Sequence, residues 1–165
     1  MSDHYAWLPE LMTMAQHDGD WSKYEAALYA AFVADFVSSK PIFRGVKLGL
    51  KRHPLSQGKE ATYWHFTSEG SVEADRVPDL RRCERIRWPR PGIDNSTEPN
   101  VKVWNTERRG ERRITIWLER EDYVIVLADR GSYLLPWTAY CVERAHRREK
   151  LQREFEAFKK AAQKG

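Results

Sequence analysis

The sequence contains little cysteine and no long apolar run. Its two cysteines, Cys83 and Cys141, lie far apart and form neither a CxxC pair nor the Cys/His spacing of a zinc site. This argues against a disulfide framework and against a structural zinc ion. The N-terminal segment MSDHYAWLPEL lacks an apolar h-region, and no stretch approaches the length of a membrane span. We therefore expect free structural thiols, cytoplasmic residence and no membrane partner.

The common nucleotide-binding and hydrolase motifs are also missing. No GxxxxGK[ST], GxGxxG, HExxH or GxSxG pattern occurs. Their absence argues against a nucleotide hydrolase, a zinc protease and an α/β-hydrolase. Carboxylates gather at Glu119, Glu121 and Asp122, but beside Arg120 at the end of an expected strand they are typical of a solvated turn. We expect no metal site and no cofactor.

The chain has the length and composition of one folded domain. It has 165 residues, of which 41% are hydrophobic and 32% are charged. These values are compatible with a packed interior under a densely ionised surface. We expect a single domain over 1–165, with a helical part at about 5–39, a sheet at about 42–143, and a C-terminal helix at about 145–163.

Positive charge is concentrated in one segment. The formal net charge is +4, which favours anionic partners but is also an ordinary aid to solubility. The segment RRCERIRWPR has five arginines and Trp88 against one glutamate. Like charges this close repel one another unless something anionic lies opposite, so a polyanion is expected here, with a solvated face as the alternative. The expected RNA contacts are Lys51, Lys59, Arg81, Arg82, Arg85, Arg87, Trp88 and Arg90.

The periodicity of apolar residues predicts an α+β fold. Helical spacing begins at Trp21, and the tail from 145 repeats Leu151, Phe155, Phe158 and Ala162 along one face. Alternating patterns predict strands at 42–50, 61–68, 101–107, 112–121, 122–130 and 132–143. The segment 70–100, rich in proline and charge, is expected to form a long basic loop. The prediction is N-terminal helices packed on an antiparallel meander of four to five strands, with a C-terminal amphipathic helix.

Several side chains on or beside the expected sheet suit metal-free RNA cleavage. In that reaction a base takes the proton of a ribose 2′-hydroxyl, the oxygen attacks the adjacent phosphorus, and the 5′-oxygen departs. Histidine suits proton transfer, and lysine or arginine offsets the charge on the phosphorane. Within the strand pattern ATYWHFTS, His65 falls mid-strand. The full set is Lys51, Arg52, His53, Lys59, His65, Thr67, Arg130, Thr138 and Tyr140.

The stretch ADRGSYLLPWTAYCVE resembles the closing hairpin of the barnase, EndoU, colicin and RelE-like (BECR) ribonuclease fold. In that fold a final strand with a TAY-type motif carries an active-site hydroxyl. Together with KRHP, GKEATYWHFTSEG and PDLRRCERIRWPRP, the stretch also resembles phage-borne proteins assigned to this superfamily. The resemblance covers roughly residues 51–143.

The resemblance implies site residues and partners. Thr138 would be the active-site hydroxyl with Tyr140 nearby, and His65 would transfer the proton. Arg130 would contact the phosphate, and His53 is the candidate for the family's second histidine. We add Arg52 as a second expected phosphate contact. The function implied is a toxin-like, metal-independent endoribonuclease that acts on RNA, with a cognate antitoxin or immunity protein as a further partner.

Plainer interpretations stand beside each of these. His65 could be an interior histidine satisfied by a neighbouring strand, Thr138 and Tyr140 could serve strand packing, and Trp88 could anchor the loop in the core. The basic start of the tail helix, around Arg147 and Arg148, indicates a ligand or an acidic neighbour because cations are disfavoured at a helix N-terminus. The alternative function is a non-catalytic module that binds RNA or protein. A third is an interaction protein that uses exposed tryptophans.

Overall fold

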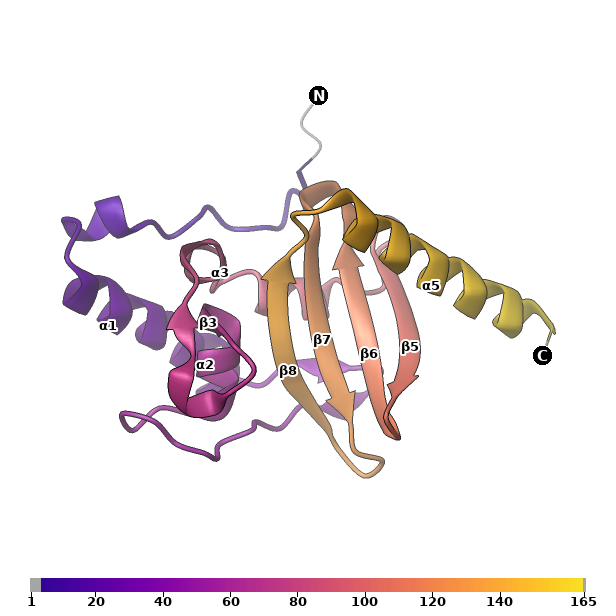
Figure 1. Cartoon of the computed structure of the whole chain (residues 1–165), viewed down its shortest axis with the longest axis horizontal. Helices are drawn as coiled ribbons and strands as arrows, with labels where there is room; N and C mark the ends of the chain where they lie inside the picture. The colour runs from indigo at the N-terminus through magenta and orange to yellow at the C-terminus, as the bar shows by residue number, and fades with distance from the viewer. Residues whose placement is uncertain (1–3, 165) are drawn as a thin grey trace.

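The structure, a computed structural model, describes residues 4–164 except for the side chain of Ala74. The remaining residues of the expected single domain, 1–3 and 165, lie outside the described part. The chain forms an α+β fold in which N-terminal helices, a four-stranded antiparallel sheet and a C-terminal helix follow one another (Figure 1). In the described residues, no helix combines the length and apolar character needed to span a membrane.

The sheet is a simple meander, as expected. Each strand pairs with the next in antiparallel register, in the order β5-β6-β7-β8. The turn after β5 places Arg109 and Gly110 at φ 53° and 77°, the left-handed conformations that a tight hairpin needs. The strands are β5 (Lys102–Arg108), β6 (Glu111–Leu118), β7 (Tyr123–Asp129) and β8 (Leu134–Cys141).

One face of the sheet is buried under the first half of the chain. Ile116, Leu118 and Ile125 point into an apolar core with Leu28 and Phe32. The helices that contribute to this core are α1 (Trp21–Phe32), which continues through a π turn at Val33–Val37, α2 (Ala61–Thr67), α3 (Leu80–Glu84) and α4 (Pro89–Asp94). Asp20 caps α1 by accepting a hydrogen bond from the backbone N–H of Lys23, which confirms the expected helix start.

The opposite face is covered only in part. Helix α5 (Ala145–Lys164) buries Leu151 against Trp104, Trp117 and Val124, and its Phe155 packs at the rim of this second core. The expected amphipathic tail helix is therefore confirmed. Ala162, expected on the same face, is exposed. Since α5 packs chiefly against β5 (Figure 1), the rest of this face stays open.

The segment 61–68, expected as a strand, forms helix α2. Ala61, Tyr63, His65 and Phe66 are all buried and Trp64 is partly exposed, so this short helix is enclosed on nearly every side. A helix buried all round shows no 3.6-residue period, and its aromatic residues are typical of strands. The prediction that His65 lies mid-strand was therefore wrong, because His65 lies in the last turn of a helix that packs beside β8.

Two other expectations about local structure were wrong. The region 42–50 is not one strand but a small hairpin, β1 (Ile42–Phe43) and β2 (Val46–Lys47), because the chain reverses at Arg44 and Gly45 with φ 50° and 80°. The region 70–100 is not a long loop. It contains α3, α4, a 3-10 turn at Glu73–Asp75, and strand β4 (Val77–Pro78), which pairs with β3 (Ser68–Glu69) just before the region.

Candidate functional site

A β-bulge in β8 shapes the centre of the candidate site. Val126 pairs with Thr138 and Leu127 pairs with Pro136, so Trp137 is an extra residue with no partner of its own on β7. A bulge changes the direction in which neighbouring side chains point. Trp137 and Thr138 consequently line the same hollow, although adjacent residues of a regular strand point to opposite faces.

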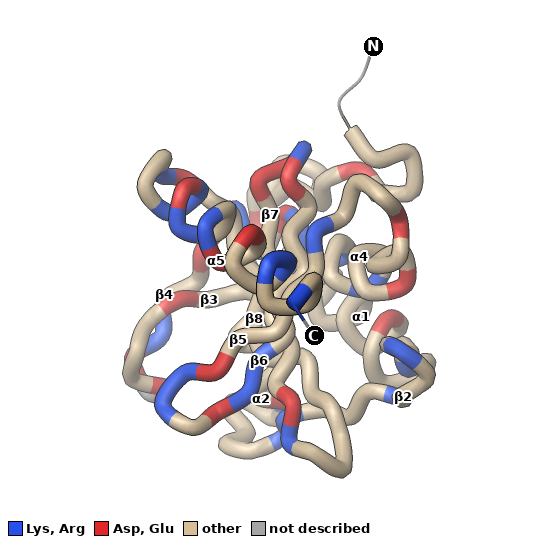
Figure 2. Tube along the Cα trace, turned by 90° about the vertical axis from the view of Figure 1, so that its right-hand side faces the viewer, with Lys and Arg blue, Asp and Glu red and all other residues tan. Residues whose placement is uncertain are grey.

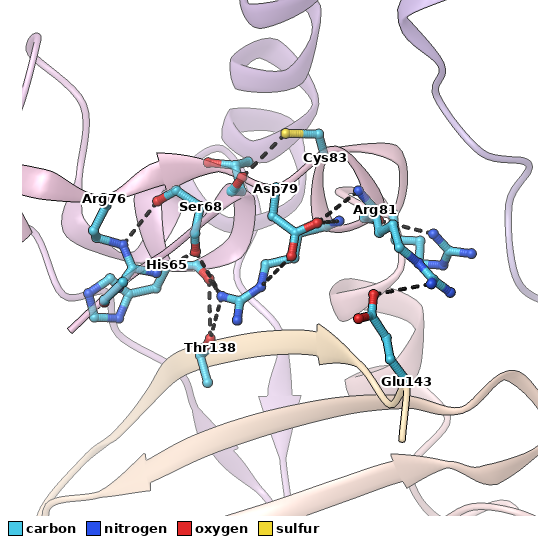
Figure 3. A network of polar contacts seen from close by, with 12 residues as sticks. His65, Ser68, Arg76, Asp79, Arg81, Cys83, Thr138 and Glu143 are labelled. Atoms are coloured by element: carbon cyan, nitrogen blue, oxygen red, sulfur yellow. Dashed lines mark hydrogen bonds and ion pairs between the residues drawn. The ribbon is translucent and has the colours of Figure 1, made fainter. Parts of the chain in front are cut away.

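His65 and Thr138 converge at this bulge. The hydroxyl of Thr138 lies 3.2 Å from the main-chain oxygen of His65, and the Nδ1 atom of His65 lies 3.1 Å from the main-chain oxygen of Trp137 (Figure 3). The Nε2 atom of His65 lies 2.5 Å from Oε1 of Glu73. The histidine is buried, but the side chain of Glu73 is 39% exposed, so Nε2 faces a partner that reaches the surface.

The partners of His65 fix which ring nitrogen exchanges its proton. Burial lowers the pKa of His65 below its usual value, and the hydrogen bond with Glu73 offsets part of that effect. The carbonyl oxygen of Trp137 and the carboxylate of Glu73 can only accept hydrogen bonds, so both ring nitrogens donate in the observed contacts. Nδ1 keeps its proton on the carbonyl, and Nε2 is the atom that loses its proton when the ring becomes neutral. Burial alone would raise the pKa of Glu73, but its hydrogen bond and ion pair with His65 hold that pKa below the usual range.

Arg82 connects helix α2 to strand β8 by hydrogen bonds. Its Nη1 atom donates to the main-chain oxygens of His65 and Ser68 at 3.0 and 2.8 Å and reaches the Thr138 hydroxyl at 3.4 Å. Its Nε atom lies 3.5 Å from the carboxylate of Asp79. Arg82 thereby satisfies carbonyl groups at the C-terminal end of α2 and ties them to β8. This arginine, expected to contact RNA, is held by the protein itself.

Three cations gather around the indole of Trp137. Lys51, Arg113 and Arg130 lie 4.5, 4.2 and 5.7 Å from its ring centroid. Glu111 is the carboxylate closest to two of them: it forms an ion pair with Arg113 and lies 3.9 Å from Arg130. One carboxylate against three cations leaves this corner electropositive, which suits a phosphate group.

Other expected catalytic residues lie away from this cluster. Arg52 and His53 are exposed in the connection before α2, and within the described residues no contact joins either side chain to His65. Lys59 lies 3.9 Å from Glu25 and 5.3 Å from the ring centroid of Tyr29. The structure therefore brings together Lys51, His65, Arg130 and Thr138 but not Arg52, His53 or Lys59.

Most of the expected arginine stripe is engaged in internal contacts. Arg81 pairs with Glu143 at 3.1 Å (Figure 3), and Arg85 lies 3.8 Å from Glu84. The remaining two arginines bind near the N-terminal helices: Arg87 donates to the main-chain oxygen of Glu10, and Arg90 pairs with Asp94 and donates to the oxygen of Asp35. The like charges thus meet acidic or carbonyl partners within the chain.

Trp88 is a core residue. It is 6% exposed and donates from Nε1 to the main-chain oxygen of Pro9 at 2.9 Å. Its ring lies edge-on against Tyr123. The expectation that it stacks on an unpaired base does not fit this burial, and the alternative of a core anchor is the one observed.

Two hollows flank Thr138 and Tyr140. The sheet-face hollow, about 760 Å³, lies between the open part of the sheet and α5 and includes Trp137, Thr138, Tyr140, Arg147, Lys150 and Glu154. The edge hollow, about 460 Å³, lies beside α3 and shares Thr138, Tyr140 and Arg147. Burial raises the pKa of Tyr140, so its phenol stays neutral, and the guanidinium of Arg147 lies 5.4 Å from its ring centroid.

The carboxylates after β6 form a charged turn. Glu119 pairs with Lys102 at 2.5 Å and with Arg148 at 3.2 Å, and Arg148 also binds Asp122. The acidic neighbour expected for the basic start of α5 is therefore present for Arg148. In the part of the chain that the structure describes, no three His, Cys, Asp or Glu side chains form a group that could hold a metal ion.

The sequence reasoning missed Glu73, Arg113 and Trp137. Glu73 falls in the segment expected to form a long basic loop, and Arg113 and Trp137 fall in expected strands, where no role was assigned to them. The proline of LLPWTAYC is compatible with an edge strand or with a bulge, so the sequence alone does not locate the bulge at Trp137. Comparisons with protein-family models, curated proteins and solved structures found no match. Membership of the BECR superfamily therefore stays a prediction.

Proposed function

We propose that this chain is a metal-independent endoribonuclease that cleaves RNA by attack of a ribose 2′-hydroxyl on the adjacent phosphate. The observation that carries the proposal is the convergence of His65, Thr138 and Lys51 with Arg130 at the bulge of β8. These residues come from four separate parts of the chain. Convergence of a proton-transfer group, a hydroxyl and cations is the arrangement that this chemistry needs.

His65 supplies the base in the proposed reaction. With Nδ1–H held by the carbonyl of Trp137, the neutral ring presents the lone pair of Nε2. A 2′-hydroxyl takes the position now held by the carboxylate of Glu73, whose partly exposed side chain can turn toward solvent. Nε2 accepts the 2′-proton, the O2′–P bond forms, and the P–O5′ bond breaks. Water protonates the departing 5′-oxygen, and the hydroxide that this leaves takes the proton from Nε2, which restores the neutral ring.

The cations at Trp137 stabilise the charge on phosphorus. Lys51 and Arg130 are held near the ring, where Arg113 adds a third positive charge. Preorganised cations of this kind act where negative charge develops in the transition state. The hydroxyl of Thr138 fixes the end of α2 and, with it, the position of His65. We also propose a cytoplasmic location, since both cysteines are free thiols.

The test is cleavage of total RNA by purified protein in excess EDTA, with product ends analysed for 2′,3′-cyclic phosphate. We expect cyclic-phosphate fragments from the wild type and a loss of about 10²–10⁴-fold in rate for His65→Ala. His17→Ala is the matched control, because His17 lies outside the cluster. Intact RNA with folded wild-type protein, across RNAs of varied sequence and structure, contradicts the proposal.

A second candidate is a non-catalytic RNA-binding module with the same fold. One observation favours it: both ring nitrogens of His65 already have partners, so its ring is fully satisfied within the chain. Salt-sensitive RNA binding without cleavage is the result expected of such a module. A cognate antitoxin or immunity protein belongs only to the first candidate.

A further inference from the structure

In the part of the chain that the structure describes, four exposed cations outside the arginine stripe have no carboxylate partner. In the described residues, no ion pair engages Arg108, Arg109, Arg147 or Lys150, and all four side chains are exposed. By contrast, four of the five arginines between 81 and 90 form ion pairs. A cation that the protein does not neutralise is available to an external anion.

These four cations border one space. All of them line the sheet-face hollow, where Arg108 comes from the end of β5, Arg109 from the turn that follows it, and Arg147 and Lys150 from α5. The hollow also contains Arg113, so five cations face three carboxylates: Glu107, Glu111 and Glu154. In Figure 2, blue positions mark both the turn between β5 and β6 and helix α5. Positive charge thus stands on two sides of the open sheet.

The inside of the hollow is suited to bases rather than to phosphate alone. Trp137 and Tyr140 are partly exposed within it, and Thr106 and Thr115 add hydroxyl groups. Exposed aromatic rings bordered by cations are how proteins bind single strands, by stacking the bases and following the backbone. Helix α5 stands over one side of the sheet, so a double helix meets its side chains before it reaches Tyr140.

We propose that the sheet-face hollow binds single-stranded RNA, with its phosphates on Arg108, Arg109, Arg147 and Lys150 and a base against Tyr140. The hollow includes Trp137 and Thr138, which contact His65 through a main-chain oxygen and a hydroxyl, so a strand that lies along it passes beside the β8 bulge. The inference deepens the proposed function, since it rests on RNA as the substrate. It moves the binding surface from the arginine stripe to the sheet.

The experiment measures binding separately from cleavage. A fluorescein-labelled 2′-O-methyl oligouridylate, which has no 2′-hydroxyl to attack, is titrated with the full chain at several salt concentrations, beside the same strand in a duplex. We compare the wild type with Arg108→Gln/Arg109→Gln and Arg147→Gln/Lys150→Gln. Lys160→Gln/Lys164→Gln is the control, because it removes the same charge from the same helix α5 but outside the hollow.

We expect the wild type to bind the single strand at least tenfold more tightly than the duplex. Each hollow variant should reduce the slope of log affinity against log salt by about 1.4, from two lost phosphate contacts at about 0.7 each, and the control should keep the slope. Three results would each overturn the inference. They are binding of the duplex as tight as that of the single strand, a loss of affinity in the control as large as in the hollow variants, and wild-type affinity in both hollow variants.

The two proposals fail in distinguishable ways. RNA cleavage with unaltered binding by the hollow variants retains the ribonuclease and removes this binding surface. Single-strand binding that depends on the four cations, with natural RNA left intact, retains the surface and removes the catalytic proposal. Absence of RNA binding together with capture of a protein through the same four residues overturns the inference in favour of a protein partner.

Discussion

The hydroxyl of Thr138 donates a hydrogen bond of 3.2 Å to the main-chain oxygen of His65, 73 positions earlier in the chain. Arg82 binds the same two groups, so the last strand of the sheet, α2 and α3 meet at one point. The backbone that carries the proposed base is therefore fixed by a side chain of β8. Loss of the Thr138 hydroxyl should therefore alter the placement of His65 even where it leaves the ring itself intact.

Thr138→Val should lower the cleavage rate about tenfold or more, whereas Thr138→Ser should keep most of it. Valine has nearly the same shape but removes the hydroxyl that binds the His65 carbonyl, while serine retains it. Loss of this one hydrogen bond should also lower the free energy of unfolding by about 1 kcal/mol. Initial rates and urea unfolding of both variants check the prediction. Equal rates for valine and wild type would show that the hydroxyl has no part in the reaction.

Glu73→Gln should move the acidic limb of the pH–rate profile to lower pH. Burial lowers the pKa of His65 and the charge and hydrogen bond of Glu73 raise it, so removal of that charge lets the pKa fall further. Since a base acts when unprotonated, kcat/KM should rise with pH through this pKa. The profile is measured between about pH 4 and 8, where a free histidine titrates near 6.5. Glu69→Gln, a nearby exposed carboxylate, is the control.

Gly92→Ala should destabilise the fold, and Ile125→Val should relieve that effect. A Cβ atom at position 92 would lie 2.3 Å from Cδ1 of Ile125, which is fully buried. Overpacking of this kind costs about 1–3 kcal/mol. Valine lacks the Cδ1 atom, so the double variant should be more stable than the sum of the two single changes predicts. Thermal unfolding of the wild type, the two single variants and the double variant measures this double-mutant cycle. If the two changes in unfolding free energy simply add, the contact between positions 92 and 125 is contradicted.

Cys83 should resist thiol reagents in the folded protein and react once the chain unfolds. It is fully buried, its thiol donates to the main-chain oxygen of Thr67, and burial raises its pKa to about 12. A thiol reacts as the thiolate, so both access and ionisation are suppressed. Alkylation at pH 8 with and without urea, followed by peptide mass spectrometry, measures the difference. Fast labelling of Cys83 without urea contradicts the packing around α3.

The meander and the two terminal helices could be predicted because their signals are local. The strands from Lys102 to Cys141 are rich in β-branched and aromatic residues and are separated by turn residues, and α1 and α5 repeat apolar residues at helical spacing. Helix α2 could not be predicted this way, because it is buried on nearly all sides and so carries no period. The same burial explains why His65 was assigned to a strand.

The sequence by itself determined the fold class, the wide separation of the two cysteines, and the residue types from which a site can be built. Only the tertiary structure decided which of them meet. The bulge at Trp137, the bridge through Arg82 and the pairing of the arginine stripe with Glu143, Asp79 and Asp94 all join distant segments. Periodicity reports which face a residue occupies, but contact between distant residues depends on how the elements pack, which no local pattern records.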